Sequence, residues 1–585
     1  MTQAARHQAP SSYVPQNLDA TRWEAIEPLL SSLRDRPVAS AADLESWLLD
    51  RSELEAACNE SRANLYITMT CRTDDQAAQS AYTAYIETIA PKLSPALFEL
   101  DKRQAELTEK FPLDEARYAV LVRATKADVE IFRPENVPLE TRQSLLSQKY
   151  DQIIGAMSVE FDGREQTIPQ MARYQEVTDR GVREAAWRLV ADRRLKDADA
   201  IHQIYDDMIA IRHQIARNAG FTNYVGYAFK SKHRFDYGPE DCFAFHEGVE
   251  RHIVPLMRDL EKRREKTLGV DALRPWDLGV DVKGRAPLRP FERGQELVSK
   301  SVATFKALDP RLAAMLSTMG DGSNTNGPSG GASLDLDSRK GKAPGGYQYM
   351  RDRSRRAFIF MNAAGLVRDV VTMVHEAGHA FHSMLCVDEP LLAYRHSPIE
   401  FAEVASMSME LLTLPHLDAP GAFYASKEDH NRHRRMQVEK SILLLPWIAT
   451  IDAFQHWVYT NPTHTRAQRE QHWLALDDRF GNAVSWEGLD AHRRLVWQRQ
   501  LHLFGVPFYY IEYGIAQLGA LQLWIHSLEK GEKSAIDAYM RALSLGGSKP
   551  LPDLFAAAGL EFDFGSETIA RICDRVRSEL DKLPE

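Results

Sequence analysis

The chain has 585 residues, of which 44% are hydrophobic and 26% charged, and its formal net charge is −10 with a pI near 6.1. This composition is typical of a globular protein with room for more than one lobe. The acidic balance argues against nucleic acid or an anionic membrane as the main partner of the surface. Because the sequence contains neither a run of about 18 apolar residues nor the apolar core of a secretory signal, it predicts no membrane partner and a cytoplasmic location.

The first part of the chain is predicted to be helical. From residue 20 to about residue 111, apolar side chains recur at steps of three and four, as in Trp23, Ile26, Leu29, Leu30 and Leu33. The run from Ala77 to Leu107 is typical of one arm of a helical hairpin. The pattern then changes, because two short alternating stretches, 158–161 and 165–168, flank Asp162-Gly163. This arrangement predicts a β-hairpin.

Helical periodicity returns from about Val182 to Asn218, which predicts one helix with Gly220 as its C-terminal cap. The glycine- and serine-rich segment 320–331 is predicted to be a loop. Residues 357–362 read as a strand. We hypothesise that this strand offers a free edge to an extended peptide; the alternative is an interior strand that fills the core.

The central motif is His375-Glu376-Ala377-Gly378-His379. Residues four apart share one face of a helix, so His375 and His379 can reach the same metal ion while Glu376 projects beside them. Apolar residues surround the motif in the pattern of a buried helix, where unpaired imidazoles would be costly. The motif therefore predicts a zinc site with an adjacent base.

Catalytic zinc takes three protein ligands, so the two histidines need one more donor. The downstream acidic candidates are Asp388, Glu389, Glu400, Glu403 and Glu410. Ser397 and Pro398 precede Glu400 in the pattern of a capping box, which predicts that Glu400 reaches back to the Ser397 amide. The five cysteines contain no Cys-x-x-Cys pair, which favours reduced thiols, and Cys386 is interpreted as a core residue rather than a ligand.

Glu403 is the predicted third ligand, because it lies in a helix that is otherwise small and apolar and an acidic residue there needs a partner. Glu410 returns to nearly the same face, so it is a candidate acceptor that orients a histidine, or an alternative ligand. His382 shares the face of His375, and packing or indirect support is favoured over ligation.

Three segments, 360–362, 375–382 and 400–407, together resemble peptidase family M3, particularly its bacterial oligoendopeptidase F branch. The resemblance extends through 340–347 and 507–514, and weakly back to about Val182. It implies a mainly α fold whose two helical lobes enclose a deep channel that admits short peptides, with a small β-sheet near the zinc helix. It also implies a division into an N-terminal helical region, 1–180, and a catalytic region, 181–585.

The same resemblance implies that His502, Tyr510 and Tyr513 stabilise the tetrahedral intermediate, with Tyr509 matching less well. The chemistry is consistent, because a carbonyl that develops negative charge needs hydrogen-bond donors placed for the transition state. The alternative interpretation of the tyrosines is an aromatic helix face packed in the core.

We therefore predict a zinc metalloendopeptidase for short peptides, with one zinc ion per chain held by His375, His379 and Glu403. Glu376 takes a proton from the attacking water and delivers it to the leaving amine. Two alternatives remain: a metallocarboxypeptidase of related helical architecture, and a degenerate peptide-binding or scaffold protein. The sequence carries no signal for an oligomeric state.

Overall fold

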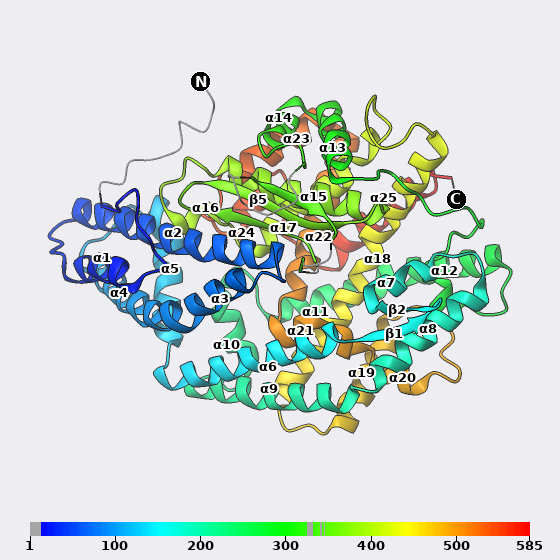
Figure 1. Cartoon of the computed structure of the whole chain (residues 1–585), viewed down its shortest axis with the longest axis horizontal. Helices are drawn as coiled ribbons and strands as arrows, with labels where there is room; N and C mark the ends of the chain where they lie inside the picture. The colour runs from blue at the N-terminus through cyan, green and yellow to red at the C-terminus, as the bar shows by residue number, and fades with distance from the viewer. Residues whose placement is uncertain (1–12, 324–331, 340–341, 344, 585) are drawn as a thin grey trace.

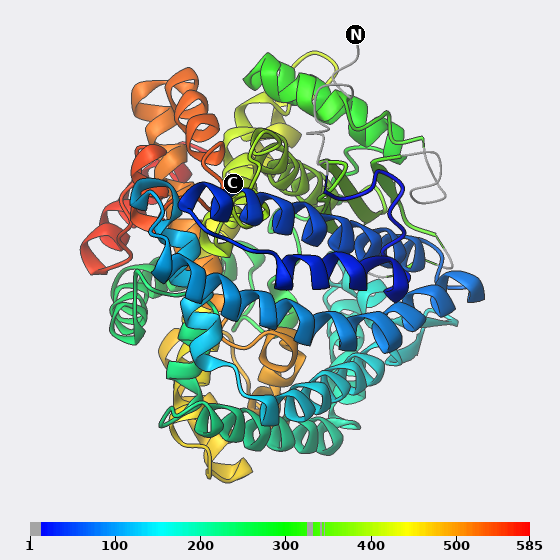
Figure 2. The same cartoon turned by 90° about the vertical axis from the view of Figure 1, so that its left-hand side faces the viewer.

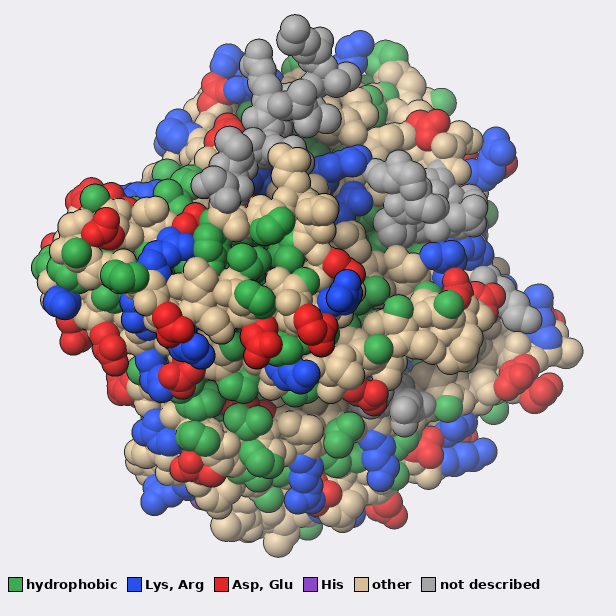
Figure 3. Space-filling model, turned by 60° about the vertical axis from the view of Figure 1, so that its left-hand side comes forward, with side chains coloured by type: hydrophobic (Ala, Val, Ile, Leu, Met, Phe, Trp, Pro, Cys, Tyr) green, Lys and Arg blue, Asp and Glu red, His purple; other side chains and the backbone are tan. Residues whose placement is uncertain are grey.

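The computed structural model describes residues 13–323, 332–339, 342–343 and 345–584. These residues form many helices and two small sheets, so the predicted mainly α class is confirmed (Figure 1). Within these ranges, no helix combines the length and the apolar character that crossing a membrane requires. Figure 3 shows acidic and basic side chains interspersed over one face, without a patch of a single sign.

The N-terminal region is helical, as predicted. It contains α1 (Trp23–Asp35), α2 (Ala41–Cys71), α3 (Gln76–Ala84), α4 (Ala90–Lys110), α5 (Glu115–Ile131) and α6 (Val137–Gly155). A π-helical turn, Tyr85–Ile89, joins α3 to α4, and α4 packs against α5 as a helical hairpin. In Figure 2 the blue helices of this region lie side by side across the front. Ile26, Trp47 and Leu100 are at most 1% exposed and belong to one apolar cluster, so these helices bury a common core.

The predicted hairpin is confirmed as β1 (Ser158–Phe161) paired antiparallel with β2 (Arg164–Thr167). Asp162 and Gly163 have φ of 55° and 71°, the positive values that a two-residue type I′ turn requires. The single helix predicted from Val182 to Asn218 is wrong, because the chain breaks into α8 (Arg180–Leu195) and α9 (Ala198–Asn218). The break lets α8 pack against the turn Pro275–Asp277 while α9 packs against α6. Gly220 caps α9 as predicted, with φ of 89°.

A three-stranded sheet lies beside the helix that carries the zinc motif. Its order is β3 (Leu334–Asp337), β5 (Arg356–Ala363), β4 (Tyr347–Arg351), with β5 parallel to β3 and antiparallel to β4. The hypothesis that residues 357–362 present a free edge is therefore wrong, because β5 is the central strand. Alternate side chains of β5 face opposite sides: Phe358 joins a cluster with Ile67 of α2, whereas Ile359 joins the main core. The free edges belong to β3 and β4.

Three helices carry most of the predicted site residues: α15 (Val367–Leu385), α17 (Ile399–Leu412) and α22 (Tyr510–Lys530). The long helix α18 (Lys427–Thr460) packs against α22. α17 packs against both α15 and α22. A Cβ on Gly378 would lie 2.5 Å from the Ala405 carbonyl oxygen, so only glycine lets α15 approach α17 this closely. In Figure 1 the sheet, α15 and α17 lie in the upper part, α6, α8 and α9 lie in the lower part, and α18 extends between them.

The remaining helices surround these elements. They are α10 (Tyr224–Ser231), α11 (Pro239–Gly248), α12 (Val254–Leu268), α13 (Gly294–Leu308), α14 (Pro310–Ser317), α19 (Arg466–Phe480), α21 (Leu501–Gly505), α23 (Glu532–Leu543) and α25 (Ser566–Leu580), with shorter helical turns between them. The division at residue 180 stays a prediction, and apolar clusters cross it: Tyr150 packs in the main core and Tyr394 in the N-terminal core. Most of the predicted 320–331 loop lies outside the described residues.

Candidate metal centre and active site

The structure brings His375, His379 and Glu403 together. The Glu403 Oε2 atom lies 3.4 Å from His375 Nε2 and 3.7 Å from His379 Nε2. The three donor atoms all lie within 4.8 Å of one another. About a fifth of each imidazole is exposed, at 21% and 19%, whereas Glu403 is buried, so the site faces open space on the histidine side. Two imidazole nitrogens and a carboxylate oxygen converging on one point form a donor set that fits zinc.

The charge balance of this cluster also fits a cation. Three carboxylates, on Glu376, Glu403 and Glu410, adjoin two imidazoles in a buried region. Burial opposes the charged form of His375, but the hydrogen bond to Glu410 and the charges of Glu403 and Glu410 outweigh it and raise the pKa of His375 to about 9. Burial raises the pKa of Glu376 and of Glu403, and a bound cation would favour the ionised form of both carboxylates.

Glu410 determines which nitrogen of His375 faces the other donors. Its Oε1 atom lies 2.7 Å from His375 Nδ1, and its Oε2 accepts a hydrogen bond of 2.5 Å from the amide of Gln437 on α18. Burial favours a neutral Glu410 carboxyl. The hydrogen bond from His375 and the positive charge of His375 nevertheless hold the pKa of Glu410 below its ordinary value. Ionised Glu410 therefore keeps a proton on Nδ1, so Nε2 is the nitrogen that can give up its proton to a metal.

Glu376 lies beside the free edge of β4. Burial is the main cause that raises the pKa of Glu376 to about 7, with His375 acting in the opposite direction. The backbone N–H of Gln348 on β4 donates a hydrogen bond to this carboxylate, which lowers its pKa. The Gln348 side-chain amide donates a hydrogen bond of 3.2 Å to the Ser383 hydroxyl of α15. The predicted base is therefore held next to β4, on the edge of that strand that does not pair with β5.

The predicted capping box at Glu400 is wrong. Pro398 is the N-cap of α17 and makes no side-chain cap, while the Ser397 hydroxyl donates to the Pro398 carbonyl at 3.2 Å. Glu400 points instead into a buried network, where it accepts a 2.7 Å hydrogen bond from the Tyr237 hydroxyl and lies 4.0 Å from Arg234. The Glu400 side chain therefore points away from the metal cluster, because Tyr237 and Arg234 hold it in the core.

Two other candidates also point away from ligation. Glu389 pairs with Arg117 through contacts of 2.9 and 2.5 Å. His382 is buried against the ring of Phe401, with centroids 6.3 Å apart, and burial lowers its pKa to about 3. His382 therefore packs as a neutral side chain.

His502 on α21 lies among the three tyrosines around the start of α22. Its ring centroid is 5.7, 4.9 and 6.0 Å from those of Tyr509, Tyr510 and Tyr513. The Tyr509 hydroxyl donates to Glu403 Oε1 at 3.4 Å and is hydrogen-bonded to Tyr513. The Tyr510 hydroxyl instead interacts with Trp447 and Gln500. Tyr509, which matched the resemblance less well, is thus the tyrosine in contact with a predicted ligand.

A hydrogen-bond relay fixes the tautomer of His502. Trp447 Nε1–H donates to Gln500 Oε1 at 3.0 Å, and the Gln500 amide nitrogen lies 2.6 Å from His502 Nδ1. Because an indole is only a donor, Gln500 must turn its oxygen toward Trp447 and donate to Nδ1. Burial also lowers the pKa of His502 to about 4, so the ring is neutral and carries its proton on Nε2. Sequence reasoning missed both residues: Gln500 lies two positions before His502, but Trp447 lies far away in the chain and carried no sequence signal.

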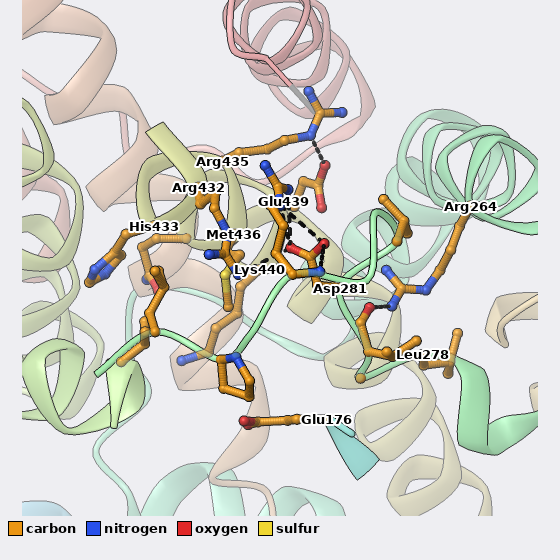
Figure 4. A pocket seen from close by; sticks show the side chains of 18 of the residues that line it. Glu176, Arg264, Leu278, Asp281, Arg432, His433, Arg435, Met436, Glu439 and Lys440 are labelled. Carbon is orange, nitrogen blue, oxygen red and sulfur yellow. Dashed lines mark hydrogen bonds and ion pairs between the residues drawn. The ribbon is translucent and has the colours of Figure 1, made fainter. Parts of the chain in front are cut away.

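A cavity of about 570 Å³ is lined by Arg432, Met436 and Lys440 of α18 (Figure 4). Val371, one helical turn before His375, and Gln437, the donor to Glu410, also line it. Both acidic and basic side chains line the cavity, and two of them, Arg432 and Asp281, form an ion pair of 3.2 Å. Lys440 extends into the same space in Figure 4, and its charge contributes to the low pKa of Glu410.

Comparisons with known proteins identify sequences and structures that resemble the chain. Residues 173–572 match the sequence profile described as Peptidase family M3. The chain is 22% identical over 357 residues to the chromosomal oligoendopeptidase F of Lactococcus lactis subsp. cremoris, an alignment that covers 58% of this chain and 54% of the relative. It is 23% identical over 349 residues to the oligopeptidase PepF of Bacillus subtilis strain 168, covering 58% and 48%. These matches span about half the length of the curated relatives.

Solved structures resemble the chain over nearly its whole length. PZ peptidase A, solved with an inhibitor, is 25% identical and superimposes with a TM-score of 0.86, covering 97% of this chain and 99% of that one. A putative oligoendopeptidase F is 26% identical with a TM-score of 0.85, covering 96% and 97%. The predicted two-lobed helical fold of this family is therefore confirmed.

Proposed function

The chain belongs to peptidase family M3, and we propose that it is a zinc-dependent oligoendopeptidase that hydrolyses short peptides. The observation that carries the proposal is the convergence of His375, His379 and Glu403 within 4.8 Å, with Glu376 beside them at the edge of β4. His375 Nε2, His379 Nε2 and a Glu403 oxygen would hold the ion. When bound, zinc would supply Lewis-acid polarisation of a water molecule and of the scissile carbonyl.

Glu376 is the proposed general base and acid. Its burial favours the neutral form, so the carboxylate gains a proton readily from an attacking water and can return it to the leaving amine. Its position next to β4 supports this role, because a peptide lying along the strand edge would bring its carbonyl next to the carboxylate.

His502 Nε2–H and the Tyr509 and Tyr513 hydroxyls are the proposed donors to the oxygen that develops negative charge. The relay from Trp447 through Gln500 supports a donor role for His502, because it leaves the proton on the nitrogen opposite Gln500. The contact of Tyr509 with Glu403 supports a place for its hydroxyl next to the ion. Tyr510 is reassigned from the proposed catalytic donors to a support of Gln500.

The free edge of β4 is the proposed binding surface for the substrate backbone. An extended peptide can add to an exposed strand through main-chain hydrogen bonds, which recognise length and conformation rather than sequence. The cavity lined by Lys440 would receive one end of the peptide. Peptide hydrolysis in a recess of this kind favours short, unfolded substrates, and a cytoplasmic location is part of the proposal.

A metallocarboxypeptidase remains the second candidate, because Lys440 offers a cation that could hold a substrate C-terminus in the cavity. Product mapping by mass spectrometry decides between the two on peptides of graded length that are blocked at both ends. An endopeptidase cuts internal bonds of the blocked peptides, and chelator abolishes the cleavage. If only peptides with a free C-terminus are cut, the endopeptidase proposal fails; if metal analysis finds no ion and no peptide is cut, the protein is a degenerate binder.

A further inference from the structure

A second cluster of potential metal ligands lies between α11 and α18, outside the proposed active site. α11 carries Cys242 and His246, and α18 carries Asp452 and His456. Each pair is spaced by four residues, so both of its side chains emerge from one face of their helix. Because α11 packs against α18, the two faces meet.

The distances among these side chains suit a small coordination sphere. Asp452 Oδ2 lies 2.9 Å from His246 Nε2 and 3.4 Å from His456 Nε2. Ligand atoms bonded at about 2.0 to 2.1 Å to a tetrahedral zinc are separated by about 3.3 Å. The donor atoms of Cys242, Asp452 and His456 all lie within 4.8 Å of one another.

The cluster is buried, and two of its polar atoms have no hydrogen-bond partner within the described ranges. Cys242 and Asp452 are 0% exposed, and the two histidines are at most 4% exposed. Among the described residues, Asp452 Oδ1 and His456 Nε2 have no hydrogen-bond partner. A buried polar atom without a partner costs free energy, which a bound ligand would recover.

The charge of Asp452 also lacks a permanent counterion. Within the part of the chain that the structure describes, its ion contacts are to imidazoles alone, and no lysine or arginine nitrogen lies within 4.0 Å. Burial disfavours a charged imidazole and is the main cause that lowers the pKa of His246. A divalent cation would balance the Asp452 carboxylate and a Cys242 thiolate, with a neutral His456 imidazole completing a site of zero net charge.

We propose that Cys242, Asp452 and His456 bind a second zinc ion that serves structure rather than catalysis. A buried thiolate and imidazole are ligands typical of structural zinc, and His246 would orient Asp452 through its 2.9 Å contact. Binding displaces the Cys242 thiol proton to solvent, since the ligand is the thiolate.

The proposed ion would support the active site through α18. This helix carries Gln437, which donates to Glu410, and Trp447, which holds Gln500. Gln455, next to His456, accepts a 2.6 Å hydrogen bond from the backbone N–H of Phe508, whose φ of 61° is unusual for a residue with a side chain. Fixing α18 to α11 would therefore hold the segment that leads into Tyr509.

Cobalt substitution tests the proposal in the full-length protein. The protein is expressed in zinc-depleted medium with added cobalt, and metal content and the near-ultraviolet absorption are measured. The proposed catalytic donors are nitrogen and oxygen atoms only, so a thiolate-to-cobalt charge-transfer band reports the second site alone. We expect the band in the wild type and in His379→Ala, with the variant retaining one metal ion where the wild type holds two.

Variants of two buried cysteines complete the test. Cys242→Ser should lose the band and one of the two ions. Cys58→Ser, which changes a thiol in the N-terminal core, should keep the band and both ions. A wild-type protein without the band overturns the proposal even if Cys242→Ser fails to fold, and so does a band that persists in Cys242→Ser. If only the proposed catalytic site fails to bind metal, the wild type should show the band but hold a single ion.

Discussion

Replacing Glu410 by glutamine should weaken zinc binding without removing any proposed ligand. The glutamine oxygen can still accept from His375 Nδ1, and Gln437 can rotate its amide to pair with the new NH₂ group, so the variant chiefly removes a charge. Loss of such a support typically lowers metal affinity about 10- to 100-fold, or about 1.4 to 2.7 kcal/mol.

The size of this loss should depend on pH. Zinc must displace a proton from His375, whose pKa is about 9 without metal because Glu410 is the main favourable cause of its rise. Wild-type affinity should therefore fall about tenfold for each pH unit below about 9. Without the Glu410 charge the pKa of His375 is lower, so the proton competes less. The difference between variant and wild type should be greatest at about pH 9 and shrink toward pH 6.

Competition with a chromophoric chelator gives the zinc Kd of Glu410→Gln and wild type across this range. Glu428→Gln is the matched control, because Glu428 is an exposed glutamate in the first turn of α18 that forms an ion pair of 3.2 Å with Arg285. The reasoning is refuted if Glu410→Gln binds zinc as tightly as wild type at about pH 9, or if its loss of affinity is independent of pH.

Three further changes have definite expected outcomes. Glu376→Gln should keep its zinc by metal analysis yet lose about 10²- to 10⁴-fold in kcat, and substantial residual turnover would contradict its role as base. Tyr509→Phe should lose about 10²- to 10³-fold in kcat with little change in KM, whereas Tyr510→Phe should retain most activity; equal losses would contradict the assignment of donors. Gly378→Ala should cost about 1 to 3 kcal/mol in denaturant unfolding, because its Cβ would meet the backbone of α17, while Gly155→Ala, with nothing within 4 Å, should cost nothing.

The elements that sequence predicted correctly depend on neighbours within a few residues. The β1–β2 hairpin follows from Asp162-Gly163, the cap of α9 from Gly220, and the helix of His375 from apolar spacing. Glu403 was singled out because a lone acid in an apolar helix needs a partner, and the structure places it beside both histidines.

The predictions that failed required knowledge of distant partners. Periodicity identified residues 357–362 as a strand, but its central place depends on β3 and β4 on either side. The capping box at Glu400 was a reasonable local pattern, yet Tyr237 and Arg234, far away in the chain, draw the carboxylate into the core. Local preference is worth about 1 kcal/mol at a helix cap, which a buried hydrogen-bonded ion network can outweigh.

Sequence alone determined the mainly helical fold class and the placement of His375, Glu376 and His379 on one helix, because helical periodicity and the spacing of four residues are local properties of the backbone. Only the tertiary structure decided which tyrosine meets Glu403, which nitrogen of His502 carries the proton, and that Cys242 and His246 face Asp452 and His456. His246 and Asp452 are 206 residues apart, and their 2.9 Å contact exists only because packing brings α11 against α18.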